Sequence, residues 1–126
     1  MSKIIDIFIE SKSATRRCSQ GAIGMIKVII LLKRRAGTEP SLFRHWILEE
    51  HVNFAQLMPG LISYRVNVVK PTNTDAAYDA VTELVFESES ALHSSFNSDA
   101  GRDAVADAAR YCDGRVRLIC EEKVHF

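Results

Sequence analysis

The chain has 126 residues, 47% of them hydrophobic and 25% charged, which is the composition of an ordinary globular protein with one domain and a sizeable core. Sixteen basic residues balance sixteen acidic ones. Because no net charge attracts nucleic acid or an anionic membrane surface, both classes of partner are disfavoured. The sequence contains no apolar run that is long enough to cross a membrane as a helix.

The cysteines do not suggest a bound metal ion. They are odd in number, and their positions are Cys18, Cys112 and Cys120. They lack the spacing of metal ligands, so we interpret them as free thiols of a cytoplasmic protein. Pairs of His, Asp, Glu and Cys with ligand spacing are also missing from the sequence. We therefore expect no metal site and no cofactor.

Residues 1–24 differ in character from the rest of the chain, with a short apolar patch followed by a polar, basic stretch. The first strong strand pattern begins at Met25. We therefore interpret residues 1–24 as an N-terminal extension and residues 25–126 as the folded domain. Residues 26–33 are apolar on both alternating sets, which predicts a strand that is covered on both faces.

Residues 41–64 predict a long amphipathic helix, a stop and the start of a strand. With a turn of about 100° per residue, one face of the helix is apolar. Glu50 falls inside this apolar face and His51 falls at its margin, so these two polar residues are out of place. Pro59 and Gly60 end the helix. The expected apolar face consists of Phe43, Trp46, Ile47, Phe54, Leu57 and Met58.

Three more strands and a second helical region follow. We expect strands over residues 61–69, 78–87 and 116–126. Between the last two strands, Ser88 caps a helical region that breaks near Gly101 and ends at Asp113 and Gly114.

From Met25 onward the order of elements is βαββαβ, which predicts an α+β fold: a ferredoxin-like sandwich with a four-stranded antiparallel sheet and both helices on one face. The other face of the sheet would then expose apolar side chains. A patch of this kind usually marks an interface. We therefore expect a second copy of the chain to cover it, sheet on sheet, as a homodimer. The patch consists of Ile29, Leu31, Val81 and Val85.

Several stretches resemble the EthD domain family of the dimeric α/β-barrel superfamily. In chain order they are FRHW, the following His51, MPGL, YDAVTELVFES, GRDAVADAARYCD and EEKV. The stretch EHVNFAQLMPGLISYRVNVV is also similar to methylmuconolactone methylisomerases. The resemblance covers residues 25–126. It implies a dimer in which two four-stranded sheets close into a dimeric α/β barrel.

The same resemblance implies a part in catabolism. EthD proteins are associated with oxidative degradation, notably ether degradation beside a cytochrome P450 system, and the domain is sometimes grouped with oxidoreductases. Other members of the superfamily are cyclases and isomerases that move protons without a cofactor. The family's recurring histidine corresponds to His51. Trp46 occupies the first place of the family's aromatic pair, whereas Ile47 stands where the family often has tryptophan.

His51 is the candidate catalytic residue, because a neutral imidazole beside a pocket can accept and return a proton. The alternative is a histidine that only forms a hydrogen bond to a neighbouring strand. Glu50 could be a partner carboxylate, or it could extend past Trp46 to solvent, which we favour. Both Trp46 and Phe54 are candidate ligand contacts, although such residues are more often part of a core.

Further candidate contacts with a ligand lie on the middle strands. They would line the cleft or the barrel, and Arg65 would orient an oxygen-rich ligand. The alternative is a cross-strand pair of Arg65 with Glu83 that has structural value only. The candidates are Tyr64, Arg65, Asn67 and Glu83.

Two functions of different classes remain open. The first is a cofactor-independent enzyme that transfers protons on a small cyclic or carbonyl substrate, as isomerases and cyclases do, with His51 as acid and base. The second is a non-catalytic accessory protein of an oxidative degradation pathway, which would bind a small molecule in the same pocket.

Overall fold

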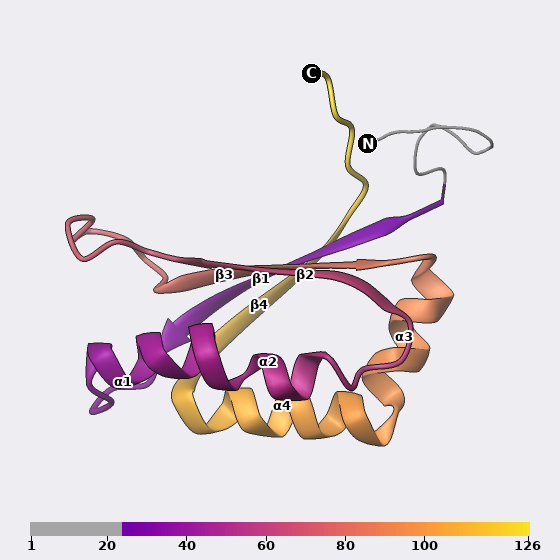
Figure 1. Cartoon of the computed structure of the whole chain (residues 1–126). Coiled ribbons are helices and arrows are strands. Elements are labelled where there is room, and N and C mark those ends of the chain that lie inside the picture. The colour runs from indigo at the N-terminus through magenta and orange to yellow at the C-terminus, as the bar shows by residue number, and fades with distance from the viewer. Residues whose placement is uncertain (1–23) are drawn as a thin grey trace.

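The computed structural model describes residues 24–126, and in this part of the chain all helices lie against one face of a four-stranded antiparallel sheet (Figure 1). The strand order is β2-β3-β1-β4. This is the ferredoxin-like fold that the sequence predicted. The strands are β1 (Ile26–Arg34), β2 (Leu61–Val68), β3 (Ala80–Phe86) and β4 (Cys112–Cys120). The helices are α1 (Pro40–His45), a π-helical turn η1 (Trp46–Glu50), α2 (Val52–Ala55), α3 (Glu89–Asn97) and α4 (Asp99–Tyr111).

All but the last residue of the predicted N-terminal extension, residues 1–24, lies outside the described residues. Cys18 belongs to this part. Within residues 24–126, no helix is both long and apolar enough to pass through a bilayer.

The last strand was predicted over residues 116–126, but this range is wrong. Strand β4 begins directly after α4 at Cys112, whose backbone is extended with φ −124° and ψ 134°. It ends at Cys120, which pairs with Lys27 of β1. Because the ladder between these two strands starts at Lys27, the residues after Cys120 leave the sheet (Figure 1).

The core is one apolar layer between the sheet and the helices. Alternate residues of the central strand β1 point into it, because successive side chains of a strand face opposite sides of the sheet. Trp46 and Ile47 of the first helical segment and Leu92 of α3 complete the layer from the helical side, and each is buried. The buried β1 residues are Val28, Ile30 and Leu32.

The two helices of the second crossover meet at Ser98, and the break predicted near Gly101 is therefore three residues too late. The Ser98 hydroxyl accepts a hydrogen bond from the Gly101 N–H at 3.1 Å and so caps α4. Gly101 is buried in the first turn of α4. A Cβ atom at Gly101 would lie 2.1 Å from the carbonyl oxygen of Ser95 and 2.8 Å from the Cα of Phe96. Glycine is therefore needed for close packing of α3 on α4.

The opposite face of the sheet carries no helix in the described part of the chain. Ile29, Leu31, Val81 and Val85 lie on it, as the strand alternation predicted, and they are half-buried. We call this the helix-free face. Leu118 of β4 extends the apolar surface and is exposed.

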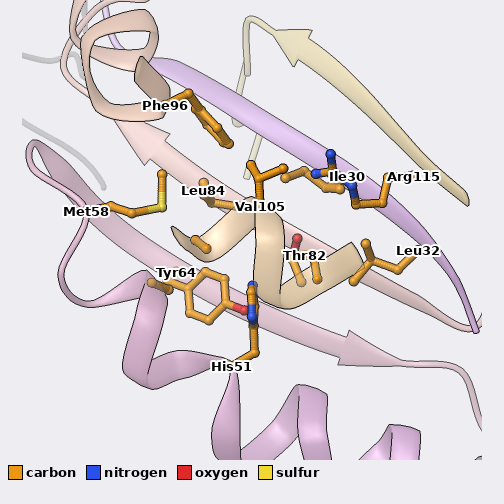
Figure 2. A pocket seen from close by; sticks show the side chains of 13 residues that line it. Ile30, Leu32, His51, Met58, Tyr64, Thr82, Leu84, Phe96, Val105 and Arg115 are labelled. Carbon is orange, nitrogen blue, oxygen red and sulfur yellow. The ribbon is translucent and has the colours of Figure 1, made fainter. Parts of the chain in front are cut away.

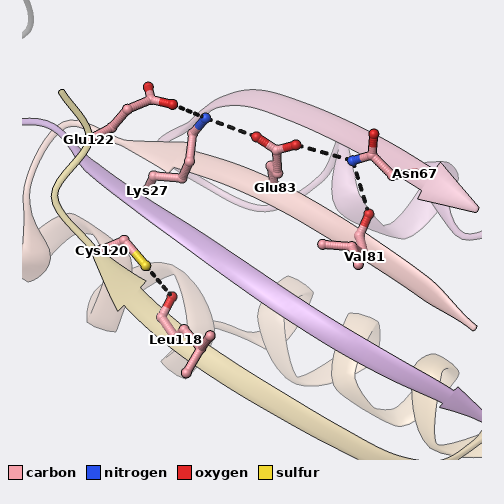
Figure 3. Close-up of polar contacts among 7 residues, drawn as sticks. All are labelled: Lys27, Asn67, Val81, Glu83, Leu118, Cys120 and Glu122. Carbon is pink, nitrogen blue, oxygen red and sulfur yellow. Dashed lines mark hydrogen bonds and ion pairs between the residues drawn. The ribbon is translucent and has the colours of Figure 1, made fainter. Parts of the chain in front are cut away.

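A charged network crosses the helix-free face (Figure 3). The Lys27 ammonium donates a hydrogen bond to the Glu83 carboxylate at 2.8 Å and another to Glu122. Asn67 donates to the other oxygen of Glu83 at 3.1 Å. Arg65 is the register partner of Glu83, which the alternative of a cross-strand pair requires, but the Glu83 carboxylate forms its hydrogen bonds with Lys27 and Asn67. The hydrogen bond from Lys27 is the main reason that the pKa of Glu83 is lowered.

We expect Gly101→Ala to destabilise the fold by about 2 kcal/mol or more, because the new methyl group would overlap backbone atoms that cannot move independently. Urea unfolding measures this change. Gly114→Ala is the matched control, because its nearest neighbour would be Lys33 Cβ at an ordinary 3.9 Å. If Gly101→Ala were as stable as the control, the close approach of the two helices would not constrain the fold.

The lowered pKa of Glu83 makes the stability of the protein depend on pH. In the unfolded chain this carboxyl titrates near its ordinary pKa of 4.5, and in the folded protein its pKa is lower. Ionised Glu83 therefore stabilises the fold above about pH 4.5, and this contribution is lost as the pH falls through the folded pKa.

We expect Glu83→Gln to lower the free energy of unfolding at neutral pH and to flatten its decline between about pH 5 and pH 3. Urea unfolding at several pH values measures both effects. Glu87→Gln makes the same charge change at an exposed position and should leave the slope nearly unchanged. Equal slopes for the two variants would contradict the role of Glu83.

Candidate functional site

A π-helical turn orients the candidate catalytic histidine. The His51 N–H donates to the Trp46 carbonyl at 2.9 Å, five residues back rather than four. This bonding adds one residue to the turn and shifts every later side chain around the helix axis. As a result, 13% of the His51 side chain is exposed, compared with 50% of the Glu50 side chain. The prediction that Glu50 lies inside the apolar face and His51 at its margin is therefore wrong.

Two other expectations for this helix also change. Glu50 lies in solvent and pairs with His45 at 3.4 Å, which agrees with the preferred reading that it extends to solvent. Leu57 was expected on the apolar face, but it is exposed. The reason is that α2 ends at Ala55, so Leu57 lies in the turn before β2.

A buried carboxylate holds the histidine. One oxygen of Asp107, Oδ2, lies 2.7 Å from His51 Nδ1 and accepts a hydrogen bond from Trp46 Nε1 at 2.9 Å. Only 5% of the Asp107 side chain is exposed. Because an ionised carboxylate only accepts hydrogen bonds, Nδ1 of His51 carries the proton of the neutral ring. The lone pair of the ring is then on Nε2, which can act as a base.

Asp107 is not among the site residues that the sequence predicted. A signal was available, because Ala104, Asp107, Ala108 and Tyr111 have the spacing of one helix face. A carboxylate inside such an apolar face is out of place, which is the same signal that the sequence pattern gave for Glu50. Its buried position in α4 distinguishes it from the exposed acidic residues of the same helix.

His51 borders a small cavity between the sheet and the helices (Figure 2). The cavity has a volume of about 40 Å³, and most of its lining is apolar, including Ile30, Leu84 and Val105. Tyr64 of β2 also lines it, and its hydroxyl group is buried with no hydrogen-bond partner among residues 24–126. Burial, followed by the negative charge of Asp107, raises the pKa of Tyr64, so that the phenol stays protonated.

The two aromatic residues predicted to contact a ligand, Trp46 and Phe54, lie next to the His51 ring and not in the cavity wall. The Trp46 indole is buried and stacks on Tyr111, with ring centroids 4.7 Å apart. Phe54 is half-buried, with its ring 6.2 Å from that of His51. These rings restrict the orientation of the imidazole. Neither side chain is part of the cavity lining.

The remaining predicted contacts lie elsewhere. Arg65, Asn67 and Glu83 are on the helix-free face, and Glu50 is in solvent. The structure therefore brings only His51 and Tyr64 of the predicted residues into the cavity lining. A role in ligand binding for the three residues of the helix-free face stays a prediction that depends on a dimer.

The described residues contain no group of three His, Cys, Asp or Glu side chains that could hold a metal ion. Cys112 is a free thiol, and burial raises its pKa to about 11. It stays protonated near neutral pH and is therefore a poor nucleophile. The acid and base chemistry available at the cavity comes from His51 and Tyr64.

Comparison with solved structures shows the same fold in several proteins. An EthD family protein from Bacillus halodurans is 20% identical, with a TM-score of 0.67 over 79% of this chain and 99% of that chain. A dimeric protein of unknown function from Bacteroides fragilis, described as having a ferredoxin-like fold, is 15% identical, with a TM-score of 0.64 over 79% and 97% of the two chains. SnoaB, a cofactor-independent oxygenase from Streptomyces nogalater, is 9% identical, with a TM-score of 0.61 over 80% and 95%.

No curated protein matches the chain in sequence. The sequence model of the EthD domain, in contrast, matches residues 35–115. This range is more than half of the chain and includes His51, Tyr64 and Asp107. The chain therefore belongs to the EthD domain family.

Proposed function

We propose that this protein is a cofactor-independent enzyme that transfers protons on a small carbonyl or lactone substrate, with His51 as general base and general acid. The hydrogen bond from His51 Nδ1 to buried Asp107 carries this proposal. It leaves Nε2 as the basic nitrogen of a ring that lines the cavity. The resemblance to a superfamily that includes isomerases and cyclases also implies reactions of this class.

The surroundings of His51 support a catalytic role over a purely structural one. Only Nδ1 of the ring is used within the described residues, and Nε2 is left open to a ligand or to solvent. Asp107 and Trp46 would act as positioning residues, because they touch the imidazole and do not line the cavity. The ring would therefore be ready for proton transfer before the substrate binds.

One structural neighbour supports chemistry without a cofactor. SnoaB is described as a cofactor-independent oxygenase, so a protein of this fold can perform chemistry without one. One fold can carry unrelated reactions, and the residues at the site determine the chemistry. The local similarity to methylmuconolactone methylisomerases and a part in ether or aromatic degradation remain predictions, as does a cytoplasmic location.

Exchange of hydrogen for deuterium beside a carbonyl group tests the proposal without knowledge of the natural substrate. Small ketones and lactones are incubated with the protein in D₂O, and the loss of the α-proton signal is followed by ¹H NMR. We expect exchange, and we expect His51→Gln to slow it by about 100-fold or more, which is the usual contribution of a positioned proton-transfer group. Glutamine retains a donor for Asp107, so the fold should survive.

Asp107→Asn tests the positioning role. The amide cannot reproduce the two hydrogen bonds that Oδ2 accepts together with the charge, so we expect exchange about tenfold slower or more. The ¹⁵N shifts of the His51 ring report the tautomer, and they should lose the signature of protonated Nδ1. A control is Asp103→Asn, at an exposed site on the same helix. Binding of a probe without any exchange would instead indicate the non-catalytic accessory protein.

We propose that the assembly is a homodimer formed through the helix-free face. That face carries half-buried Ile29, Leu31, Val81 and Val85, and the Bacteroides fragilis relative is described as dimeric. A symmetric pair of chains is the commonest closed assembly. In such a dimer Arg65, Asn67 and Glu83 would lie between the two sheets.

Light scattering should report about twice the chain mass of 14.1 kDa. Val85→Glu would bury an unpaired carboxylate between the sheets, so we expect it to dissociate or unfold the protein. Leu57→Glu introduces the same charge at an exposed position on the helical side and should leave the mass unchanged. A monomer at micromolar concentration would contradict the dimer.

A further inference from the structure

We propose that the substrate is a small carbonyl compound with a negatively charged group, in which the Tyr64 hydroxyl binds the carbonyl oxygen and Arg115 binds the charged group. This inference rests on the proposed function, because it assigns a substrate class to the same cavity. Two independent observations carry it: a buried hydroxyl group without a partner among the described residues, and an arginine-lined groove that shares lining residues with the cavity.

The Tyr64 hydroxyl is the first observation. It is buried and forms no hydrogen bond within residues 24–126, although a buried polar group without a partner is costly and rare in folded proteins. The phenol keeps its proton and can therefore donate a hydrogen bond. A ligand oxygen in the cavity is the natural acceptor, since Tyr64 and His51 both line it and lie at the same end in Figure 2.

This pairing defines a balanced reaction step. His51 Nε2 takes a proton from the carbon beside the carbonyl group, and the electron pair of the broken C–H bond forms a C=C bond. The electron pair of the C=O π bond moves to the oxygen, which becomes an enolate. The hydrogen bond from Tyr64 strengthens as this negative charge develops. The proton then returns from Nε2 to carbon, so that no oxidant or reductant is needed.

The second observation is a larger groove outside the cavity. It has a volume of about 560 Å³ and shares Phe96, Val105 and Arg115 with the cavity lining. Arg102 and Arg117 also line this groove, and no acidic residue does. A groove lined by cations without carboxylates attracts an anion.

Among the arginines of this groove, Arg115 is the one that is available to bind an anion. Arg102 already forms an ion pair with Asp99 at 2.7 Å, and Arg117 lies over the Phe96 ring at 4.4 Å from its centroid. Arg115 has no hydrogen-bond or ion-pair partner within the described part of the chain, and it reaches both spaces. Its guanidinium can bind a carboxylate through two parallel hydrogen bonds.

The sizes of the two spaces determine which part of the substrate enters each. A cavity of about 40 Å³ holds only a few heavy atoms, since one water molecule needs roughly 10 to 15 Å³ of cavity volume. The reacting carbon and the carbonyl group would fit there. The charged group would stay in the wider groove, where water still solvates it.

Three probes of similar size test this inference: levulinate, which has a ketone and a carboxylate; 2-pentanone, which has the ketone alone; and pentanoate, which has the carboxylate alone. Binding is measured by NMR chemical-shift titration and α-deuterium exchange by ¹H NMR. We expect levulinate to bind at least tenfold more tightly than either other probe. Arg115→Gln should weaken the binding of levulinate by about tenfold and leave the affinity for 2-pentanone nearly the same, because 2-pentanone has no charged group.

Further variants separate the two residues from general effects. Arg44→Gln removes the same charge from an exposed site on α1 and should change nothing. Tyr64→Phe retains the ring but removes the donor, so exchange of levulinate should slow by about tenfold or more with KM nearly constant.

The outcomes are distinguishable. Equal affinity for levulinate and 2-pentanone, or no effect of Arg115→Gln, overturns the inference even if His51-dependent exchange is observed. Full exchange activity in Tyr64→Phe overturns its carbonyl-binding part. If no probe exchanges, the proposed function fails, while preferential binding of levulinate through Arg115 would still support the assigned ligand class.

Discussion

The geometry of the site depends on the hydrogen bonds to the buried Asp107 carboxylate. Its Oδ2 atom receives hydrogen bonds from the Trp46 indole and the His51 imidazole, and it thereby links the first helical segment to α4. A buried charge is tolerated only when hydrogen bonds replace its hydration. Removing either donor would therefore leave the carboxylate under-solvated. The same requirement holds the imidazole in one orientation and in one tautomer beside the cavity.

The π-helical turn makes this contact possible. Regular α-helical bonding would separate residues five apart by roughly 140° around the axis. The extra residue in the turn brings His51 back toward the side of Trp46, so that both side chains reach one oxygen. Helical turns of this type are frequent at functional sites, and here the turn directly precedes the candidate base. Glu50 is turned outward as a consequence.

The two faces of the sheet have different surroundings and different proposed roles. One face packs against the helices and forms one wall of the cavity, to which Ile30, Tyr64 and Leu84 contribute. The helix-free face combines apolar side chains with the Lys27, Glu83 and Asn67 network. Because alternate residues of each strand face opposite sides, substitutions on neighbouring positions can affect the site and the proposed interface separately.

The sequence by itself determined the features that depend on local periodicity. Strand alternation and helix spacing predicted the βαββαβ order, the helix-free face and the apolar residues of β1, because these follow from the period of each element. The glycine and proline after Met58 marked the end of the first helical segment. The family resemblance indicated His51, and Tyr64 was among the candidate ligand contacts on the middle strands.

Only the tertiary structure decided which polar residues meet. The π-helical turn depends on how Trp46 and His51 satisfy a carboxylate 56 residues from His51, and no helical wheel contains that information. Likewise, the close packing of α3 on α4 determines the need for Gly101, and the pairing with β1 determines where β4 ends. Periodicity describes one element at a time. The site arises from contacts between elements, which is the physical reason that Asp107 and Arg115 became evident only in the folded chain.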